Sequence, residues 1–475
     1  MPDSSVQNPN ATYDLAVIGA GSAGFSAAIT AADDGARVAL IGYGTIGGTC
    51  VNVGCVPSKA MIRAMDTMHI KAVAARFDGV EASAAVTDWQ AVVQQKQALV
   101  DDLRAAKYTD VLPNYQSVAY LEGKAVFDEK GGLQMNGKTI DADKVIIATG
   151  SKPHVPEIEG IESVTHYDST SILELETLPK SLLVMGGGYI GVELAQMFAR
   201  AGTKVTIVTR RRLLPEGEPE ISAALTEYFE LEGVRVLDGL SYENVAEADG
   251  QVNLQVTGSY GAEVLSAEKL LLATGRVPNV ESLELANAGI KVSAQGGVVV
   301  DNRMRTSRDG VYAAGDVTGE DQFVYMAAYG AKIAAKNAMN SNSLSYDNAV
   351  VPAVVFCDPQ VASVGLTEAQ AKAAGFDAQT SVLGLENVPR ALAARDTRGL
   401  IKLVADRATK KLLGAHILAP EGSDSIQTAA MAIRAGMSYE QLGEMIFPYL
   451  TTVEGLKLAA QTFDKDVSKL SCCAG

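Results

Sequence analysis

One pattern occurs twice in the sequence. Residues 14–35 read DLAVIGAGSAGFSAAITAADDG, and residues 181–202 read SLLVMGGGYIGVELAQMFARAG. In each stretch an apolar run precedes Gly-x-Gly-x-x-Gly, a small-residue helix follows, and a second apolar run returns at 37–42 and 204–209. Glycines at these spacings allow a tight turn and let a pyrophosphate and the helix approach the backbone closely. The sequence therefore predicts two dinucleotide-binding βαβ units.

A second repeat supports this duplication. Apolar strands that end in Ala-Thr-Gly occur at 145–150 and 270–275, and Pro-containing segments follow both. Beyond Asp347 strand-like runs such as AVVPAVVF alternate with Ala-rich helical stretches, without a further nucleotide fingerprint. We expect an α/β chain with two Rossmann-like domains and an α+β C-terminal domain. The expected boundaries divide it into 1–155, 156–275, 276–345 and 346–475.

Composition excludes several classes of function. The chain has 475 residues and a formal net charge of −16, which argues against binding to nucleic acid or to an anionic membrane. The sequence contains no run of about 18 apolar residues, so no transmembrane helix is predicted. The opening MPDSSVQNPN has neither the basic nor the apolar region of a secretory signal, so we expect a cytoplasmic protein.

The cysteines point to redox or metal chemistry. Only five occur, and four of them form two close pairs, at 50 and 55 and at 472 and 473. So few cysteines in an apparently cytosolic chain do not form a disulfide scaffold. The fifth, Cys357, lies in a strand-like run and is interpreted as a buried structural thiol.

The first cysteine pair lies in GGTCVNVGCVPSK, residues 47–59. The spacing of Cys50 and Cys55 lets the two sulfur atoms meet, and Gly54 and Pro57 shape the start of a helix. A thiolate at a helix N-terminus is stabilised by the helix dipole, which lowers the thiol pKa and makes it a nucleophile. The alternative is a pair of buried structural thiols.

The two fingerprints differ where the ribose should bind. In the first unit, the acidic residue expected about 20 residues after the fingerprint falls at Gly42. In the second unit Thr209 stands at the matching strand end, and three arginines follow, Arg210, Arg211 and Arg212. Guanidinium groups favour a 2′-phosphate, so NADPH is expected rather than NADH. The alternative is a solvated basic turn.

Together, GGTCVNVGCVPSK, the two fingerprints, the Ala-Thr-Gly strands and VYAAGDV at 311–317 resemble the pyridine nucleotide-disulfide oxidoreductase family. That family includes glutathione reductase, dihydrolipoamide dehydrogenase and mercuric reductase. The resemblance covers nearly the whole chain and implies a glutathione reductase-like fold. It implies FAD in the first unit, at Gly19, Gly21, Gly24, Gly48, Thr49, Lys59, Thr149, Gly150 and Asp316. It implies NADPH in the second unit, at Gly186, Gly188, Tyr189, Gly191, Arg210, Arg211 and Arg212.

The resemblance also implies roles for individual side chains. Cys55 is expected to form the charge-transfer thiolate against the flavin, and Cys50 the exposed interchange thiol. Lys59 and Glu193 correspond to an ion pair near the flavin, and Tyr189 to the gate over the nicotinamide pocket. A solvated lysine and a core tyrosine are the alternatives for Lys59 and Tyr189.

The C-terminal region separates branches of the family. Disulfide-reducing members carry HPTxxE, whose histidine protonates the leaving thiolate. Here residues 447–455 read FPYLTTVEG, which keeps Glu454 but places Tyr449 where the histidine should be. A phenol with a pKa of about 10 is a poor acid at neutral pH. The sequence therefore disfavours a glutathione or lipoamide substrate.

The terminal pair Cys472 and Cys473 resembles the tail of the mercuric reductase branch. Soft Hg(II) prefers thiolate ligands. The resemblance implies a homodimer in which this pair delivers Hg(II), the substrate, to Cys50 and Cys55 of the other subunit, beside Tyr108 and Tyr449. The residues alone also allow an incidental thiol pair and a packing role for Tyr108. A reductase of a small disulfide and a metal-sequestering protein without turnover are the rival functions.

Overall fold

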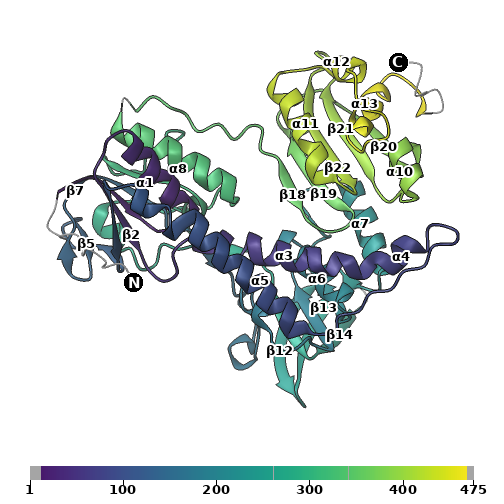
Figure 1. The fold of residues 1–475 in the computed structure, drawn as a ribbon, viewed down its shortest axis with the longest axis horizontal. Helices are drawn as coiled ribbons and strands as arrows, with labels where there is room; N and C mark the ends of the chain where they lie inside the picture. The colour runs from purple at the N-terminus through teal and green to yellow at the C-terminus, as the bar shows by residue number, and fades with distance from the viewer. Residues whose placement is uncertain (1–11, 260, 341, 468–475) are drawn as a thin grey trace. The chain divides into compact units, whose positions relative to one another are not determined.

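The computed structural model describes residues 12–259, 261–340 and 342–467 (Figure 1). The chain divides into two compact units, each assembled from three segments. The first unit comprises residues 1–60, 93–154 and 275–348, and the second comprises 61–92, 155–274 and 349–475. Among the helices of the described ranges, none is both long and apolar enough to cross a membrane.

The first unit is built on a five-stranded parallel sheet with the order β17-β7-β1-β2-β3. The strands are β1 (Tyr13–Ile18), β2 (Val38–Gly42), β3 (Val118–Glu122), β7 (Ala142–Ile147) and β17 (Val311–Ala313). Continuous apolar runs, such as the fully buried β2, are typical of parallel strands that are covered on both faces. The two apolar runs of the first fingerprint are β1 and β2, as predicted.

Helices α1 (Ser22–Asp33) and α8 (Val324–Met339) lie side by side, although about 300 residues separate them (Figure 1). Buried alanines of both helices share one core cluster with Leu15, Val17 and Leu40 of the sheet. These small side chains let the helices approach the sheet closely. The opposite face of the sheet packs on a second cluster that includes Phe127 and Leu133.

Small sheets complete the first unit. They are formed by β4 (Ala125–Phe127), β5 (Leu133–Met135) and β6 (Lys138–Thr139), and by β8 (Ser151–Pro153) paired with β16 (Arg276–Pro278).

The second unit repeats the parallel arrangement in a sheet with the order β11-β10-β9-β15. Its strands are β9 (Ser181–Met185), β10 (Lys204–Val208), β11 (Arg235–Leu237) and β15 (Lys269–Leu272), and α6 (Tyr189–Arg200) and α7 (Pro219–Leu231) belong to the same module. An antiparallel sheet of β12 (Ser241–Ala248), β13 (Gln251–Gly258) and β14 (Gly261–Ala267) packs through Leu254 and Leu265 into the same core cluster as Leu183 of β9.

The C-terminal part of the second unit has the predicted α+β composition. Its antiparallel sheet has the order β18-β19-β22-β21-β20, with bounds Ala353–Val355, Gln360–Gly365, Leu412–Ala419, Leu400–Asp406 and Ala378–Gly384. The helices are α9 (Glu368–Ala373), α10 (Pro389–Ala394), α11 (Gly422–Arg434), α12 (Tyr439–Glu444) and α13 (Glu454–Gln461). The run AVVPAVVF forms a strand only from Ala353, because the preceding Pro352 has no N–H for the ladder.

Candidate active site

The two fingerprint turns are built in the same way. Gly19 has φ +119°, and a side chain there would collide with the carbonyl oxygen of Ala148. Gly186 has φ +114°, and its side chain would collide with the carbonyl oxygen of Ala273. Ala148 and Ala273 each begin one of the Ala-Thr-Gly sequences. In each unit, therefore, the first glycine of the fingerprint packs against the Ala-Thr-Gly strand end.

Both turns leave a helix start available to an anion. Helix α1 follows Gly21 and α6 follows Gly188, and neither N-cap residue provides a side-chain hydrogen bond to the helix. A side chain at Gly188 would meet only open space, whereas one at Gly24 or Gly191 would strike the backbone of its own turn. Backbone N–H groups at a helix N-terminus bind pyrophosphate well. Both turns therefore fit a dinucleotide.

The redox cysteines stand on two short helical starts beside the first turn. Cys50 lies in α2 (Gly48–Asn52), and Cys55 is the first residue of α3 (Cys55–Asp66). Gly48 has φ +69°, and a Cβ there would be 2.6 Å from the Cα of Gly21. Gly47 N–H donates to the carbonyl of Ala20 at 2.9 Å. Gly47 and Gly48 thus place α2 in direct contact with the first nucleotide fingerprint.

Gly54 brings the two thiols together. A Cβ at this position would be 3.0 Å from the carbonyl oxygen of Thr49 and 3.4 Å from the Cα of Cys50. The Ser58 hydroxyl donates to the Gly54 carbonyl at 2.7 Å and so fixes the first turn of α3. Cys50 is half-buried, and the Cys55 side chain is exposed.

The charges around this pair differ between its members. A hydrogen bond to Cys55 raises the pKa of the Cys50 thiol, and burial and the charge of Cys55 add to the shift, whereas Lys59 opposes it. Cys50 therefore holds its proton more tightly than an ordinary thiol does. The charge-transfer thiolate expected at Cys55 stays a prediction. The expectation that Cys50 is the exposed thiol of the pair is wrong for this structure, because Cys50 lies within α2 and is half-buried whereas Cys55 is exposed.

Tyr108 lies next to the dithiol. It belongs to a π-helical turn, Ala105–Thr109, that continues α5 (Trp89–Arg104), and such turns are frequent at functional sites. Its hydroxyl is 3.0 Å from the Ser22 hydroxyl, and its ring meets Phe25 edge-on with centroids 4.8 Å apart. A Cβ at Gly47 would be 3.2 Å from the Tyr108 ring. Burial raises the pKa of Tyr108, and the charges of the two cysteines add to it.

Asp316 is held by residues that the sequence did not single out. The Ser151 hydroxyl donates to its carboxylate at 2.7 Å, and Arg276 Nε donates to the same hydroxyl at 2.8 Å. The neighbouring Thr149 and Asn279 exchange two hydrogen bonds: the Thr149 hydroxyl donates to the Asn279 carbonyl at 2.7 Å, and the Asn279 amide donates to the Thr149 carbonyl at 3.0 Å. Ser151, held by Arg276, thus orients the Asp316 carboxylate, and the Thr149 and Asn279 pair joins the two chain segments that carry Ser151 and Arg276.

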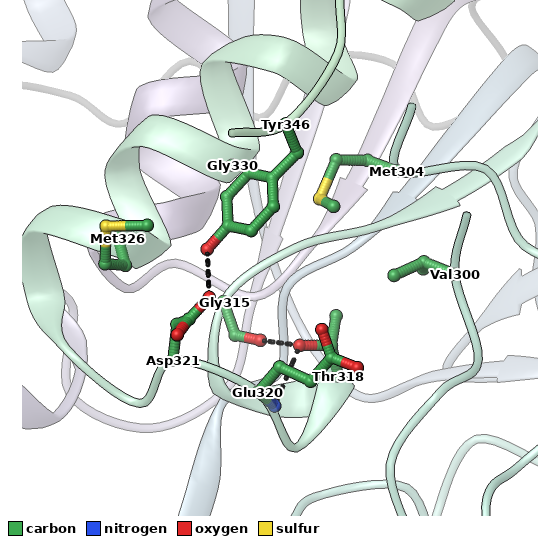
Figure 2. Close-up of a pocket in the computed structure, with 9 residues that line it drawn as sticks. All are labelled: Val300, Met304, Gly315, Thr318, Glu320, Asp321, Met326, Gly330 and Tyr346. Carbon is green, nitrogen blue, oxygen red and sulfur yellow. Dashed lines mark hydrogen bonds between the residues drawn. The ribbon is translucent and has the colours of Figure 1, made fainter. Parts of the chain in front are cut away.

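A small pocket adjoins the same turn (Figure 2). On its walls the Thr318 hydroxyl donates to the Gly315 carbonyl at 3.0 Å, and the Tyr346 hydroxyl donates to Asp321 at 2.9 Å. Burial and the bond to Asp321 raise the pKa of Tyr346, so this hydroxyl remains a donor. Both bonds brace the turn that carries Asp316.

The second unit places the expected NADPH arginines differently from one another. Arg210 lies over the Tyr242 ring at 5.2 Å, and Arg211 forms an exposed 2.7 Å ion pair with Glu216. Arg212 is half-buried and donates to the Gly217 carbonyl at 2.6 Å, so it forms part of the turn itself. Arg210 and Arg211 are the exposed guanidinium groups after β10.

The remaining predicted residues of the second unit lie on α6 and near α13. Tyr189 is the exposed first residue of α6 and is hydrogen-bonded to the Ser363 side chain. Glu193 is buried and accepts the Phe356 N–H at 2.8 Å. Tyr449 is exposed. Because Lys59 lies in the first unit and Glu193 in the second, their ion pair stays a prediction.

Two further groups of residues contain possible metal ligands. Cys472 and Cys473 lie outside the described residues. His69, Glu232 and Asp358 bring ligand atoms within 4.8 Å of one another, but Arg200 bonds both carboxylates at 2.7 Å. Burial and the Arg200 charge lower the pKa of His69. This second group is an ion-pair network rather than a metal site. Cys357 is buried, as predicted.

Sequence comparison agrees with this geometry. The profile described as pyridine nucleotide-disulphide oxidoreductase matches residues 13–335, and the dimerisation domain of the same family matches residues 351–460. The chain belongs to the pyridine nucleotide-disulphide oxidoreductase family. Membership makes it an oxidoreductase that uses FAD and a pyridine nucleotide, with a C-terminal dimerisation domain.

Relatives within the family are similar over nearly the whole chain. A mercuric reductase from Streptomyces lividans is 46% identical over 468 residues, which is 98% of this chain and 98% of the relative. A mercuric reductase from Staphylococcus aureus is 45% identical over 469 residues, which is 98% of this chain and 85% of the relative. Among solved structures, the HOCl-induced flavoprotein disulfide reductase RclA from Escherichia coli matches with a TM-score of 0.82 and 34% identity, covering 94% of this chain and 99% of that one.

Several residues that support the family's site escaped the sequence analysis. Asn52 donates to the carbonyls of Ile46 and Gly48, both at 2.9 Å, and Arg104 donates to Asn52 at 3.1 Å, so they hold the loop that leads into α2. Ser22 is the one residue of the first fingerprint that carries a hydroxyl, and that was the available signal for its contact with Tyr108. Asn52 and Arg104 are far apart in sequence and show no motif.

Proposed function

We propose that the protein reduces Hg(II) to Hg(0) with NADPH. The observation that carries this proposal is the Cys50 and Cys55 pair, which lies against the first nucleotide turn with Tyr108 beside it. The relatives named mercuric reductase support it. The overall reaction is Hg(II) + NADPH → Hg(0) + NADP⁺ + H⁺, which transfers two electrons.

The proposal assigns the cofactors to the two turns. FAD is held in 1–155 and 276–345 by the turn at Gly19, by Asp316 and by the Gly48 contact, and NADPH is held in 156–275 with Arg210 and Arg211 at its 2′-phosphate. When bound, FAD supplies the chemistry that passes an electron pair from NADPH to the metal. A cytoplasmic location suits this reaction, since NADPH and reduced thiols are available there.

The residues of the dithiol bind the metal. Soft Hg(II) is held between the two sulfur atoms, and Cys50 loses its proton as the second bond forms. Few sulfur ligands keep the ion reducible, because additional thiolates would stabilise Hg(II) further. Tyr108 contacts the ion from one side, and Tyr449 of the 346–475 domain lines the same site in the dimer. Cys472 and Cys473 of the partner subunit deliver the ion.

The test compares substrates. Purified protein should show flavin absorbance, oxidise NADPH when thiol-complexed Hg(II) is added, and show little oxidation with a panel of small disulfides. The disulfide panel matters because RclA is a disulfide reductase, and because Tyr449 replaces the acid of the disulfide-reducing branch. NADPH oxidation with a disulfide and none with Hg(II) would overturn the proposal in favour of the disulfide reductase.

Delivery by the tail has its own comparison. The double variant Cys472→Ala/Cys473→Ala should lose turnover with bulky, tightly chelated thiol complexes of Hg(II) and keep it with loosely chelated Hg(II). Equal turnover of the wild type and the double variant with both forms would contradict delivery.

A further inference from the structure

Gly42 ends β2 at the position where an acidic residue usually holds the ribose hydroxyls. It has no side chain to do this. The left-handed glycines include Gly19, Gly44 and Gly48, but not Gly42. The backbone conformation therefore does not require a glycine here, and the reason for it must be the space around its Cα.

Tyr120 fills that space. A Cβ built on Gly42 would be 2.5 Å from the Tyr120 hydroxyl oxygen and 2.8 Å from the Cβ of Ala20. Tyr120 belongs to β3, whose parallel register pairs Leu40 with Tyr120 and Gly42 with Glu122. The ring thus lies along the strand toward Gly42, and its hydroxyl end reaches the volume of a side chain at position 42, next to the fingerprint residue Ala20.

The Tyr120 hydroxyl has the chemistry to bind a sugar. Burial raises the pKa of Tyr120, and the charge of Glu122 adds to the shift, so the phenol stays protonated and both donates and accepts. Among the residues that the structure describes, none forms a hydrogen bond with this hydroxyl. A ribose hydroxyl is both a donor and an acceptor, and it matches such a group.

We propose that Tyr120 replaces the missing carboxylate and hydrogen-bonds a ribose hydroxyl in the adenosine half of FAD. Gly42 and Tyr120 then act together. The absence of a side chain at position 42 leaves room for the Tyr120 ring, and Tyr120 on the neighbouring strand β3 supplies the polar group. This assignment rests on flavin binding by the first unit, which is part of the proposed function. Its test measures the affinity for the adenosine half of FAD and not the reduction of mercury.

The first test uses Tyr120→Phe, with Tyr115→Phe as the matched control because Tyr115 is half-buried in the same core cluster. The full-length protein is stripped of flavin and reconstituted with FAD, and with FAD analogues whose adenosine lacks the 2′- or the 3′-hydroxyl. Binding is followed by flavin fluorescence. Tyr120→Phe should bind FAD roughly three- to tenfold more weakly, the loss expected for one neutral hydrogen bond. Tyr115→Phe should bind it as the wild type does.

The analogues identify the partner. Wild type should bind one deoxy analogue more weakly by a similar factor, and Tyr120→Phe should bind FAD and that analogue equally, because the same bond is removed from either side. Equal affinity of the wild type for FAD and both analogues would overturn the inference, and this comparison needs no variant to fold. A chain that bound no FAD at all would instead contradict the proposed function.

A swap gives an independent check. Gly42→Glu alone should retain less FAD, because its side chain collides with Tyr120. The Cβ of Ala20 is the other close neighbour, so the swap also carries Ala20→Gly. Gly42→Glu/Tyr120→Ala/Ala20→Gly should retain more FAD than Tyr120→Ala/Ala20→Gly, since the acid then has both space and the usual position. Equal FAD retention by these two variants would count against the shared role.

Discussion

Gly48→Ala is the substitution that most directly tests how the dithiol is held on the nucleotide turn. Gly48 has φ +69°, and a Cβ would be 2.6 Å from the Cα of Gly21. The left-handed conformation costs an alanine about 1–2 kcal/mol. An ordinary contact starts at 3.4 Å, so the two backbones must also separate by about 0.8 Å, and crowding of this kind costs about 1–3 kcal/mol. We expect a loss of about 2–5 kcal/mol in the free energy of unfolding.

Gly44→Ala is the control, since Gly44 lies in the same loop with φ +79° and a Cβ there would meet nothing within 4 Å. It should lose only the conformational part, about 1–2 kcal/mol. Urea unfolding and the FAD content per subunit measure both variants. Gly48→Ala should also release FAD, whereas Gly44→Ala should retain it. Equal unfolding free energies and equal FAD contents in the two variants would refute the close contact between Gly48 and Gly21.

Three more predictions concern side chains. Tyr108→Phe removes the bond to Ser22 and should lower the free energy of unfolding by about 1 kcal/mol, and a double-mutant cycle with Ser22→Ala should return that coupling. Because the pKa of Cys50 is raised, Hg(II) must displace the proton of this thiol when it binds. The apparent affinity of the reduced enzyme for Hg(II) should therefore rise roughly tenfold for each pH unit below that pKa, and Cys50→Ser should abolish this pH dependence. Arg210→Ala/Arg211→Ala should lower kcat/KM for NADPH roughly 10- to 100-fold and leave that for NADH nearly unchanged.

Much of the fold follows from the sequence because its elements obey local rules. The turn at Gly19 needs a glycine for its φ of +119°, and the fully buried β2 reads as an apolar run. The limits are equally local: Pro352 shortened the strand expected at AVVPAVVF, which begins only at Ala353. The repeat of Ala-Thr-Gly was visible in the sequence, but its contact with the fingerprint glycines required the structure.

Supporting side chains of the site were harder to predict. Ser151 reaches Asp316 from 165 positions away in sequence, and Tyr120 reaches Gly42 across a strand pairing, so neither shows a spacing. Ser, Asn and Tyr occur throughout any chain, and only the sheet register decides which of them meet a functional residue. Arg212 is the opposite case, a residue that the sequence predicts to bind the cofactor and that the structure uses in the turn. Adjacent arginines look equivalent in sequence, but this one donates a hydrogen bond to the Gly217 carbonyl.

The central claim, that Cys50 and Cys55 reduce Hg(II), is tested most directly by measuring mercury vapour released per NADPH oxidised. Wild type should release one Hg(0) per NADPH. Cys50→Ser and Cys55→Ser should each release none, while Cys357→Ser, a change at a buried thiol, should behave as the wild type does. Undiminished mercury release from either Cys50→Ser or Cys55→Ser would contradict the claim.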